Sequence, residues 1–169
     1  MEPSAGSVGG PGPLLERVFE RIHRESMQGL PLVNPALRVR AVGFRRLADA
    51  GRWVGVLVTP WFMNLMVLSD GTRPLPEAAT GERVTLRFPS GAYRFTAGEV
   101  EEVGRYLFCS LASPVHCFPD AETAERTAAE VMELLLRAPE GAQEAPAPDP
   151  GRRGLLGLGR CARRAEAGA

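Results

Sequence analysis

Few side chains in this sequence are suited to acid–base, nucleophilic or metal chemistry. The histidines are His23 and His116, and the cysteines are Cys109, Cys117 and Cys161. Their spacing forms neither a C-x-x-C pair nor a histidine pair of the kind that binds zinc. The glycine-rich stretches lack the preceding strand and the lysine that phosphate-binding loops require. We therefore expect no catalytic residue, no metal site and no cofactor, and a protein that is not an enzyme.

The residues with the clearest potential for recognition are apolar and lie in one central stretch. This stretch runs from Trp53 to Leu68 and reads WVGVLVTPWFMNLMVL. It is shorter than the roughly 20 apolar residues of a transmembrane helix, and Pro60 opposes a continuous helix. Its first half, residues 53–59, is apolar at successive positions, which is typical of a central strand covered on both faces.

Pro60 should form a corner in this stretch because it has no N–H to donate to a strand ladder. The next strand should begin at about Phe62, so the corner carries Trp61, Phe62 and Met63. Two interpretations are open. These side chains cap the end of the core, or they form a contact surface, since methionine repacks easily and tryptophan provides a large contact area.

Length and composition indicate one domain with unevenly placed charge. The chain has 169 residues, of which 44% are hydrophobic and 24% charged, as is usual for a globular domain. Residues 1–150 contain 15 arginines against 19 acidic residues, whereas residues 151–169 contain 5 arginines against Glu166. The basic tail has no aromatic residue to stack on bases, so we expect no nucleic-acid partner. The N-terminal residues lack a signal-peptide pattern, so we expect a cytoplasmic protein without membrane insertion.

Glycine, proline and charge patterns divide the chain into four parts. We expect a disordered N-terminus at residues 1–13, a single domain at 14–138, a linker at 139–150 and a basic flexible tail at 151–169. Within the domain, an amphipathic helix should run from residue 14 to about residue 27.

The rest of the domain reads mainly as strands. We expect a strand at residues 37–41, a turn at 45–51 and a long loop at 70–81. A hairpin should turn at Gly91, and residues 100–115 favour a strand over a short helix. A final helix should begin after Asp120 as its N-cap and stop at Pro139. This order predicts an α+β two-layer sandwich, with an antiparallel or mixed sheet and helices packed mainly on one face.

Several stretches of the chain resemble the HybE family of nickel-iron hydrogenase assembly chaperones. They are MQGLPLVNPAL (27–37), GRWVGVLVTPWFMNLMVL (51–68), FPSGAYRFTAGE (88–99), GRYLFCSLASP (104–114) and the tail segment GRRGLLGLGR. The TPWFMNL piece is the most specific. Ser69, Ala112 and Val115 depart from the family pattern.

The resemblance implies a secretion-chaperone-like fold and a cytoplasmic, non-catalytic accessory role. Members of the family act on the precursor of the small, iron-sulfur hydrogenase subunit, which carries a twin-arginine signal peptide, and delay its export until the large subunit joins. Further partners would be the large subunit and other hydrogenase accessory proteins. A rubredoxin accessory would instead show two Cys-x-x-Cys pairs, which this sequence lacks.

A partner of a twin-arginine signal must present carboxylates beside an apolar surface. The hypothesis for client binding combines the corner with nearby acidic residues. The candidate residues are Trp61, Phe62, Met63, Met66, Glu99, Glu101 and Glu102.

The tail offers a second hypothesis. Arg152, Arg153, Leu155 and Leu156 imitate the paired arginines and apolar residues of a signal peptide, so the tail either occupies the client groove or stays solvated. Two other functions stay open for the protein. One is a carrier of a small molecule, metal or iron-sulfur cofactor that uses Cys109 and a pocket behind Trp61, and the other is a structural subunit of a maturation complex.

Overall fold

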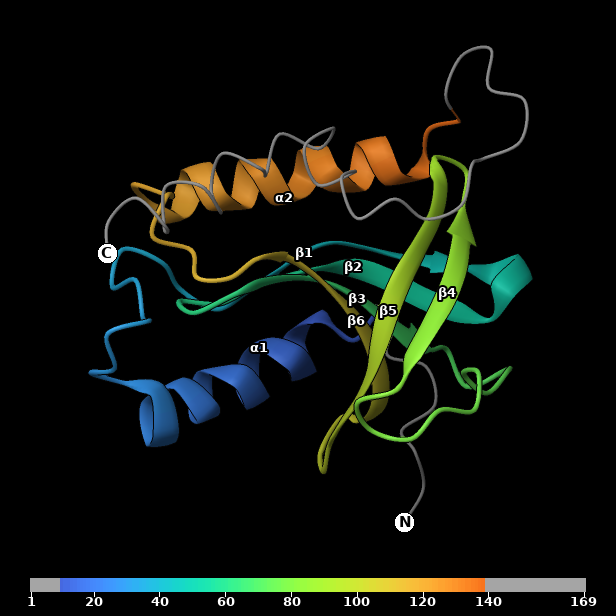
Figure 1. Ribbon diagram of the computed structural model, residues 1–169, viewed down its shortest axis with the longest axis horizontal. Coiled ribbons are helices and arrows are strands. Elements are labelled where there is room, and N and C mark those ends of the chain that lie inside the picture. The colour runs from blue at the N-terminus through green and yellow to red at the C-terminus, as the bar shows by residue number, and fades with distance from the viewer. Residues whose placement is uncertain (1–9, 139–169) are drawn as a thin grey trace.

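A six-stranded antiparallel sheet forms the centre of the molecule, and the two main helices flank it (Figure 1). The computed structural model describes residues 10–138. The elements follow in the order α1 (Gly12–Ile22), a π-helical turn (His23–Met27), β1 (Arg40–Leu47), a 3-10 turn (Ala48–Ala50), β2 (Arg52–Val58), β3 (Met63–Ser69), β4 (Arg83–Phe88), β5 (Gly91–Val100), β6 (Gly104–Ala112) and α2 (Ala121–Leu136).

The sheet has the order β1-β2-β3-β6-β5-β4, and every neighbouring pair is antiparallel. The strands β2 and β3 come from the apolar central stretch and pair along their whole length, from Arg52 opposite Ser69 to Val58 opposite Met63. The α+β class with an antiparallel sheet, predicted from the sequence, is confirmed.

The helices lie on opposite faces of the sheet, so the expectation that they pack mainly on one face was wrong. Val54, Val56 and Val58 join the buried layer beneath α2, whereas Leu57 and Met66 join the layer over α1. Figure 1 shows α2 above the sheet and α1 below it. The molecule therefore has three layers, because strands that are apolar on both faces must be covered twice.

The two helices begin as their local sequences dictate. α1 starts at Gly12, two residues before the predicted position, because Pro13 fits the first turn of a helix. α2 starts after Asp120, whose carboxylate accepts a 2.7 Å hydrogen bond from the Thr123 amide. This backbone hydrogen bond is the main reason that the pKa of Asp120 is lowered. The predicted N-cap is thus confirmed.

β1 begins at Arg40, three residues later than predicted, and extends into the expected turn as far as Leu47. Its register with β2 shifts between Val42 and Arg45, where Gly43 has a φ of 65°. This β-bulge hides the strand in the sequence because it interrupts the alternation of apolar and polar residues. The predicted loop at 70–81, the hairpin at Gly91 and the strand within 100–115 are all present.

Two glycines accept aromatic rings on the α1 face of the sheet. A Cβ atom on Gly55 would lie 2.4 Å from ring atoms of Phe44, and one on Gly98 would lie 2.9 Å from the ring of Tyr106. The absence of a side chain at these two positions lets the rings lie flat on the sheet. The Tyr106 ring is partly buried in this way, and burial raises the pKa of its hydroxyl.

The expected linker at 139–150, the tail at 151–169 and the helix stop at Pro139 lie outside the described residues, as does most of the expected disordered N-terminus. Within residues 10–138, no helix is long and apolar enough to cross a membrane.

The carboxylate of Asp70 fastens the start of the 70–82 loop to the sheet. It accepts hydrogen bonds from the amide and the hydroxyl of Thr72, at 2.8 and 2.5 Å, and from Nε of Arg46 at 2.8 Å. The Asp70 amide in turn donates to the carbonyl of Gly51 at 3.1 Å. The bonds from Thr72, with a smaller effect from Arg46, lower the pKa of Asp70 to about 2.

The Asp70→Asn variant should lose part of the acid sensitivity of the fold. A carboxyl group with a lowered pKa in the folded state stabilises the protein above its ordinary pKa of about 4, and this stabilisation is lost as the pH falls toward 2. We expect the wild-type melting temperature to fall more steeply than that of Asp70→Asn between pH 4 and pH 2. Thermal unfolding followed by circular dichroism measures both slopes, and equal slopes would contradict the role of Asp70.

Candidate functional site

The corner between β2 and β3 is a tight turn organised by Thr59. The Thr59 amide donates a hydrogen bond to the carbonyl of Phe62 at 2.8 Å. The hydroxyl oxygen of Thr59 accepts hydrogen bonds from the amides of Trp61 and Phe62 at 3.3 and 3.0 Å. Because Thr59 is fully buried, its side chain replaces water as the partner of these amides. The turn projects Trp61 and Phe62 from the end of the sheet.

Asn34 joins this corner to two other loops. Its amide nitrogen Nδ2 donates to the carbonyls of Val115 and Phe118 at 3.0 and 2.9 Å, and its backbone amide donates to the carbonyl of Pro60 at 2.7 Å. The side-chain oxygen accepts from the Ala36 amide at 3.0 Å. A single buried residue thus holds three segments together at one end of the sheet: its side chain binds the β6–α2 loop, and its backbone amide binds the corner.

The corner aromatics lean on the C-terminal end of α1 and stay partly exposed. Trp61 stacks on His23 with ring centroids 5.8 Å apart, and Phe62 meets Phe19 edge to face, also at 5.8 Å. Trp61 and Phe62 pack against each other at 5.4 Å. This packing fixes their orientation while part of each ring still faces solvent.

Two leucines that the sequence analysis did not select belong to the same end of the molecule. Leu30 and Leu32 are 41% and 40% exposed and flank Pro31 in the loop that Asn34 ties to Pro60. The signal was present in the sequence, since GLPLVNP places two large apolar residues in a loop, where burial is difficult. We call Leu30, Leu32, Trp61 and Phe62 the apolar end surface.

The two methionines proposed for client binding are core residues in this structure. Met63 is 0% exposed and packs in the layer beneath α2, and Met66 is 1% exposed and packs in the layer over α1. They lie on opposite faces of β3 and support the corner from inside. Of the predicted apolar candidates, Trp61 and Phe62 are the ones that reach the surface.

The three acidic candidates lie at the tip of the β5–β6 hairpin. Glu99 and Glu101 are exposed, whereas Glu102 forms an ion pair with Arg21 of α1. The backbone amide of Glu102 itself, and then Arg21, lower the pKa of this carboxyl group. Glu99 and Glu101 are therefore the acids available to a partner, because Glu102 is already neutralised.

The end of α1 lies between the acidic tip and the apolar end surface. Arg21 contacts Glu102, and His23 contacts Trp61. Two residues turn a helix by about 200°, so these contacts are made on nearly opposite sides of the helix. The structure places the acidic hairpin tip and the apolar end surface beside the same helical turn, but it does not join them in one pocket.

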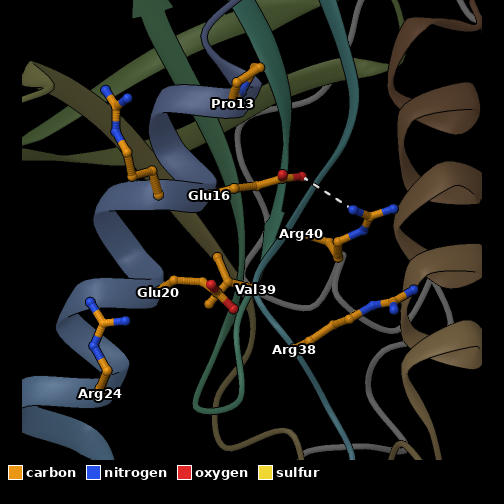
Figure 2. Close-up of a pocket in the computed structure, with 8 residues that line it drawn as sticks. Pro13, Glu16, Glu20, Arg24, Arg38, Val39 and Arg40 are labelled. Atoms are coloured by element: carbon orange, nitrogen blue, oxygen red, sulfur yellow. Dashed lines mark ion pairs between the residues drawn. The ribbon is translucent and has the colours of Figure 1, made fainter.

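A charged groove of about 470 Å³ lies beside this helix, between α1 and β1 (Figure 2). In Figure 2, Glu16 points to Arg40, 4.0 Å away. Glu20 and the buried Val39 also line the groove. Glu16 also accepts a 3.0 Å hydrogen bond from the Ala41 amide on the free edge of β1.

The arginines of β1 and of the segment before it connect the two helical layers. Arg38 and Arg40 contact Glu125 of α2 at 3.0 and 3.6 Å. The hydrogen bond with Glu125 raises the pKa of Arg38. The groove is thus an edge of the sheet bridged by ion pairs, and its lining is mainly charged, whereas small-molecule sites are typically lined by apolar residues with a few polar groups.

The carrier site hypothesised around Cys109 and Trp61 is not assembled. Cys109 packs with the layer beneath α2, whereas Trp61 packs with the layer over α1, so the sheet separates them. Within residues 10–138, no three His, Cys, Asp or Glu side chains converge as metal ligands.

Comparison with known proteins identifies the family. The family model described as "[NiFe]-hydrogenase assembly, chaperone, HybE" matches residues 11–158, which is most of the chain. The chain belongs to the HybE family of hydrogenase assembly chaperones. The resemblance seen in the sequence is thereby confirmed.

Two hydrogenase expression/formation proteins match this chain over most of their length. The hydrogenase expression/formation protein HoxT of Azotobacter vinelandii is 42% identical over 149 residues, covering 88% of this chain and 92% of HoxT. HupJ of Bradyrhizobium diazoefficiens, also a hydrogenase expression/formation protein, is 42% identical over 137 residues, covering 80% and 78%.

The solution structure of HybE from Escherichia coli has a similar fold. It matches with a TM-score of 0.63 and 28% sequence identity, covering 88% of this chain and 93% of that structure. The three-layer arrangement described above is therefore that of a HybE-family fold.

Replacement of Asn34 by alanine should loosen the apolar end surface of this HybE-family protein. The change removes one donor from each of two buried carbonyls; that of Val115 keeps the Phe118 amide at 3.2 Å, whereas that of Phe118 loses its side-chain donor. A buried carbonyl left unpaired typically costs on the order of 1–3 kcal/mol. We expect a lower free energy of unfolding in urea and faster hydrogen exchange at the corner amides. The Asn34→Asp variant keeps the acceptor for Ala36 and removes both donors, so it should be at least as damaging. A stable Asn34→Asp variant would contradict the importance of the donated bonds.

Proposed function

We propose that this protein is a non-catalytic chaperone of the cytoplasm that binds the precursor of the hydrogenase small subunit. It recognises the twin-arginine signal peptide and delays export until the large subunit has joined. The observation that carries the proposal is the partly exposed apolar end surface, held rigidly at one side of α1 with free carboxylates at the other. Membership of the HybE family supports the hydrogenase assembly role.

The two surfaces match the two parts of a twin-arginine signal. Its apolar stretch fits the end surface, where Trp61 and Phe62 present large, fixed side chains and Leu30 and Leu32 add exposed aliphatic area. Its arginines fit Glu99 and Glu101, since guanidinium–carboxylate pairs are strong and directional. A peptide that crosses the end of α1 touches both.

Removal of single side chains from the apolar end surface should weaken binding of the signal peptide. Hot-spot residues at an interface typically contribute 2 kcal/mol or more, and a tenfold change in affinity corresponds to about 1.4 kcal/mol. We expect Trp61→Ala to raise the Kd at least tenfold, and Leu30→Ala and Leu32→Ala to raise it several-fold. Fluorescence anisotropy of a labelled synthetic signal peptide measures these values.

Leu134 provides a matched control because it is 41% exposed, like Leu30, but lies on α2. Leu134→Ala should leave the affinity unchanged. Equal losses in the Leu134 and Leu30 variants would show a nonspecific effect, and normal binding by all the end-surface variants would place the client elsewhere.

The acidic arm of the site is tested with the double variant Glu99→Gln, Glu101→Gln. It should weaken binding of the twin-arginine peptide but not of a peptide in which both arginines are replaced by glutamine. The control Glu122→Gln, Glu130→Gln removes two exposed charges from α2. If both double variants have the same effect, the acids act only through the net charge.

The tail is proposed to compete with the client through Arg152, Arg153, Leu155 and Leu156, which imitate the signal. Deletion of residues 151–169 should then lower the Kd for the signal peptide, and a synthetic peptide of residues 151–160 should displace the labelled signal from the truncated protein. An unchanged Kd after the deletion would overturn the competition.

A further inference from the structure

One surface of the β4–β5 hairpin is strongly basic and is not used by the chaperone site. Val84, Leu86 and Phe88 of β4 point into the layer beneath α2. Because side chains alternate along a strand, Arg83, Thr85 and Arg87 face the opposite side. Arg94 of β5 lies directly across from Thr85, and Thr96 lies across from Arg83, so five residues form one face. We call Arg83, Thr85, Arg87, Arg94 and Thr96 the basic hairpin face.

α1 does not cover this face, although the face lies on the same side of the sheet. The apolar layer over α1 contains no residue of β4 among the described residues. Figure 1 shows β4 and β5 beyond the end of α1, with β4 at the margin of the sheet. Arg83, Arg87 and Arg94 are all exposed to solvent.

The three arginines have no acidic partner within the part of the chain that the structure describes, in contrast to all three arginines of β1. The neighbouring acid, Glu82, is engaged elsewhere, since its carboxylate accepts a 2.8 Å hydrogen bond from the Ala79 amide. Arg83 and Arg87 are about 13 Å apart along β4, at roughly 3.3 Å per residue. The hairpin thus presents a spaced row of uncompensated positive charge on a rigid support.

β4 also has an unpaired edge. It is the last strand of the sheet, with β5 as its only neighbour among the described strands. An extended segment that pairs with this edge places alternate side chains on the basic hairpin face, next to Arg83 and Arg87. Glutamate or aspartate at those positions forms cross-strand ion pairs, whereas lysine or arginine is repelled.

We propose that the β4 edge and the basic hairpin face bind an extended acidic segment of a protein partner by strand addition. Carboxylates at alternate residues of the segment pair with Arg83, Arg87 and Arg94, and its backbone extends the sheet. This site is separate from the apolar end surface and uses the opposite sign of charge. It gives the chaperone a second partner surface that can be occupied while a client is bound.

Charged edge strands also protect sheets from aggregation, and this protective role makes a different prediction. Protection requires charge alone and predicts no saturable binding of a peptide. Strand addition requires both the charges and the free backbone groups of the ligand. Protection from aggregation and strand addition are therefore distinguished with one acidic peptide and a version of that peptide whose backbone amides are modified.

The experiment uses the full-length protein and a fluorescein-labelled peptide of alternating glutamate and valine. Anisotropy should show saturable binding that weakens as salt is raised. The double variant Arg83→Glu, Arg87→Glu should bind at least tenfold more weakly. The matched control Arg17→Glu, Arg24→Glu makes the same change in net charge on exposed residues of α1 and the π-helical turn and should bind as wild type.

Three further ligands make the test decisive. A peptide of the same sequence with alternate amides N-methylated should lose binding, and a lysine–valine peptide should not bind. Equal binding of the N-methylated peptide overturns strand addition, and tighter binding of a short DNA duplex overturns an acidic protein segment as the partner. Equal losses of peptide affinity in the Arg83→Glu, Arg87→Glu variant and in its Arg17→Glu, Arg24→Glu control also overturn the proposal. Circular dichroism of both variants confirms that the fold is retained.

Discussion

The structure depends on one constraint, which is that β2 and β3 are apolar on both faces. Val54, Val56 and Val58 require cover on one side, and Leu57 and Met66 require it on the other. At roughly 25 cal/mol per Å² of apolar surface removed from water, neither face can be left to solvent without a large loss of stability. α2 covers the first face and α1 the second. The polar face of each helix then defines the outer surface of the molecule.

The same constraint creates the apolar end surface. Strands buried on both faces must still reverse direction, and their corner lies where neither helix covers the sheet completely. Thr59 satisfies the amides of the turn, and Asn34 satisfies the carbonyls of the adjoining loop, so the polar backbone of this end is paired internally. The large side chains at the corner are thereby left partly exposed in fixed positions. A rigid apolar surface loses little conformational entropy on binding, which favours a role in recognition.

The sequence predicted the elements better than their arrangement. Hydrophobic periodicity located both helices and the central strands, and the Asp120 cap and the Gly91 turn followed from local rules. The β1 strand was underestimated because the bulge at Gly43 shifts the alternation, an effect that depends on pairing with β2.

The position of the helices could not be derived from their own sequences, since an amphipathic helix does not specify which face of a sheet it covers. The two-sided apolar pattern of residues 53–59 did contain that information. For the candidate site, Trp61 and Phe62 could be selected from the sequence, because a corner at Pro60 was predictable. The burial of Met63 and Met66 depends on tertiary packing, and the pairing of Glu102 with Arg21 joins residues that are far apart in the sequence.

The placement of the helices also explains the distribution of charge. Both helices extend over the β1 side of the sheet, so acidic residues of α1 and α2 reach the arginines there: Arg38 and Arg40 meet Glu125, and Arg45 meets Glu133. Exposed pairs of this kind contribute little stability individually, but they remove the local positive potential. Among the described residues, no helix covers the basic hairpin face, and its arginines form no ion pair there. Residues 10–138 contain 15 arginines and 15 acidic residues, yet they present a positive surface at one edge of the sheet because the two helices lie closer to the other edge.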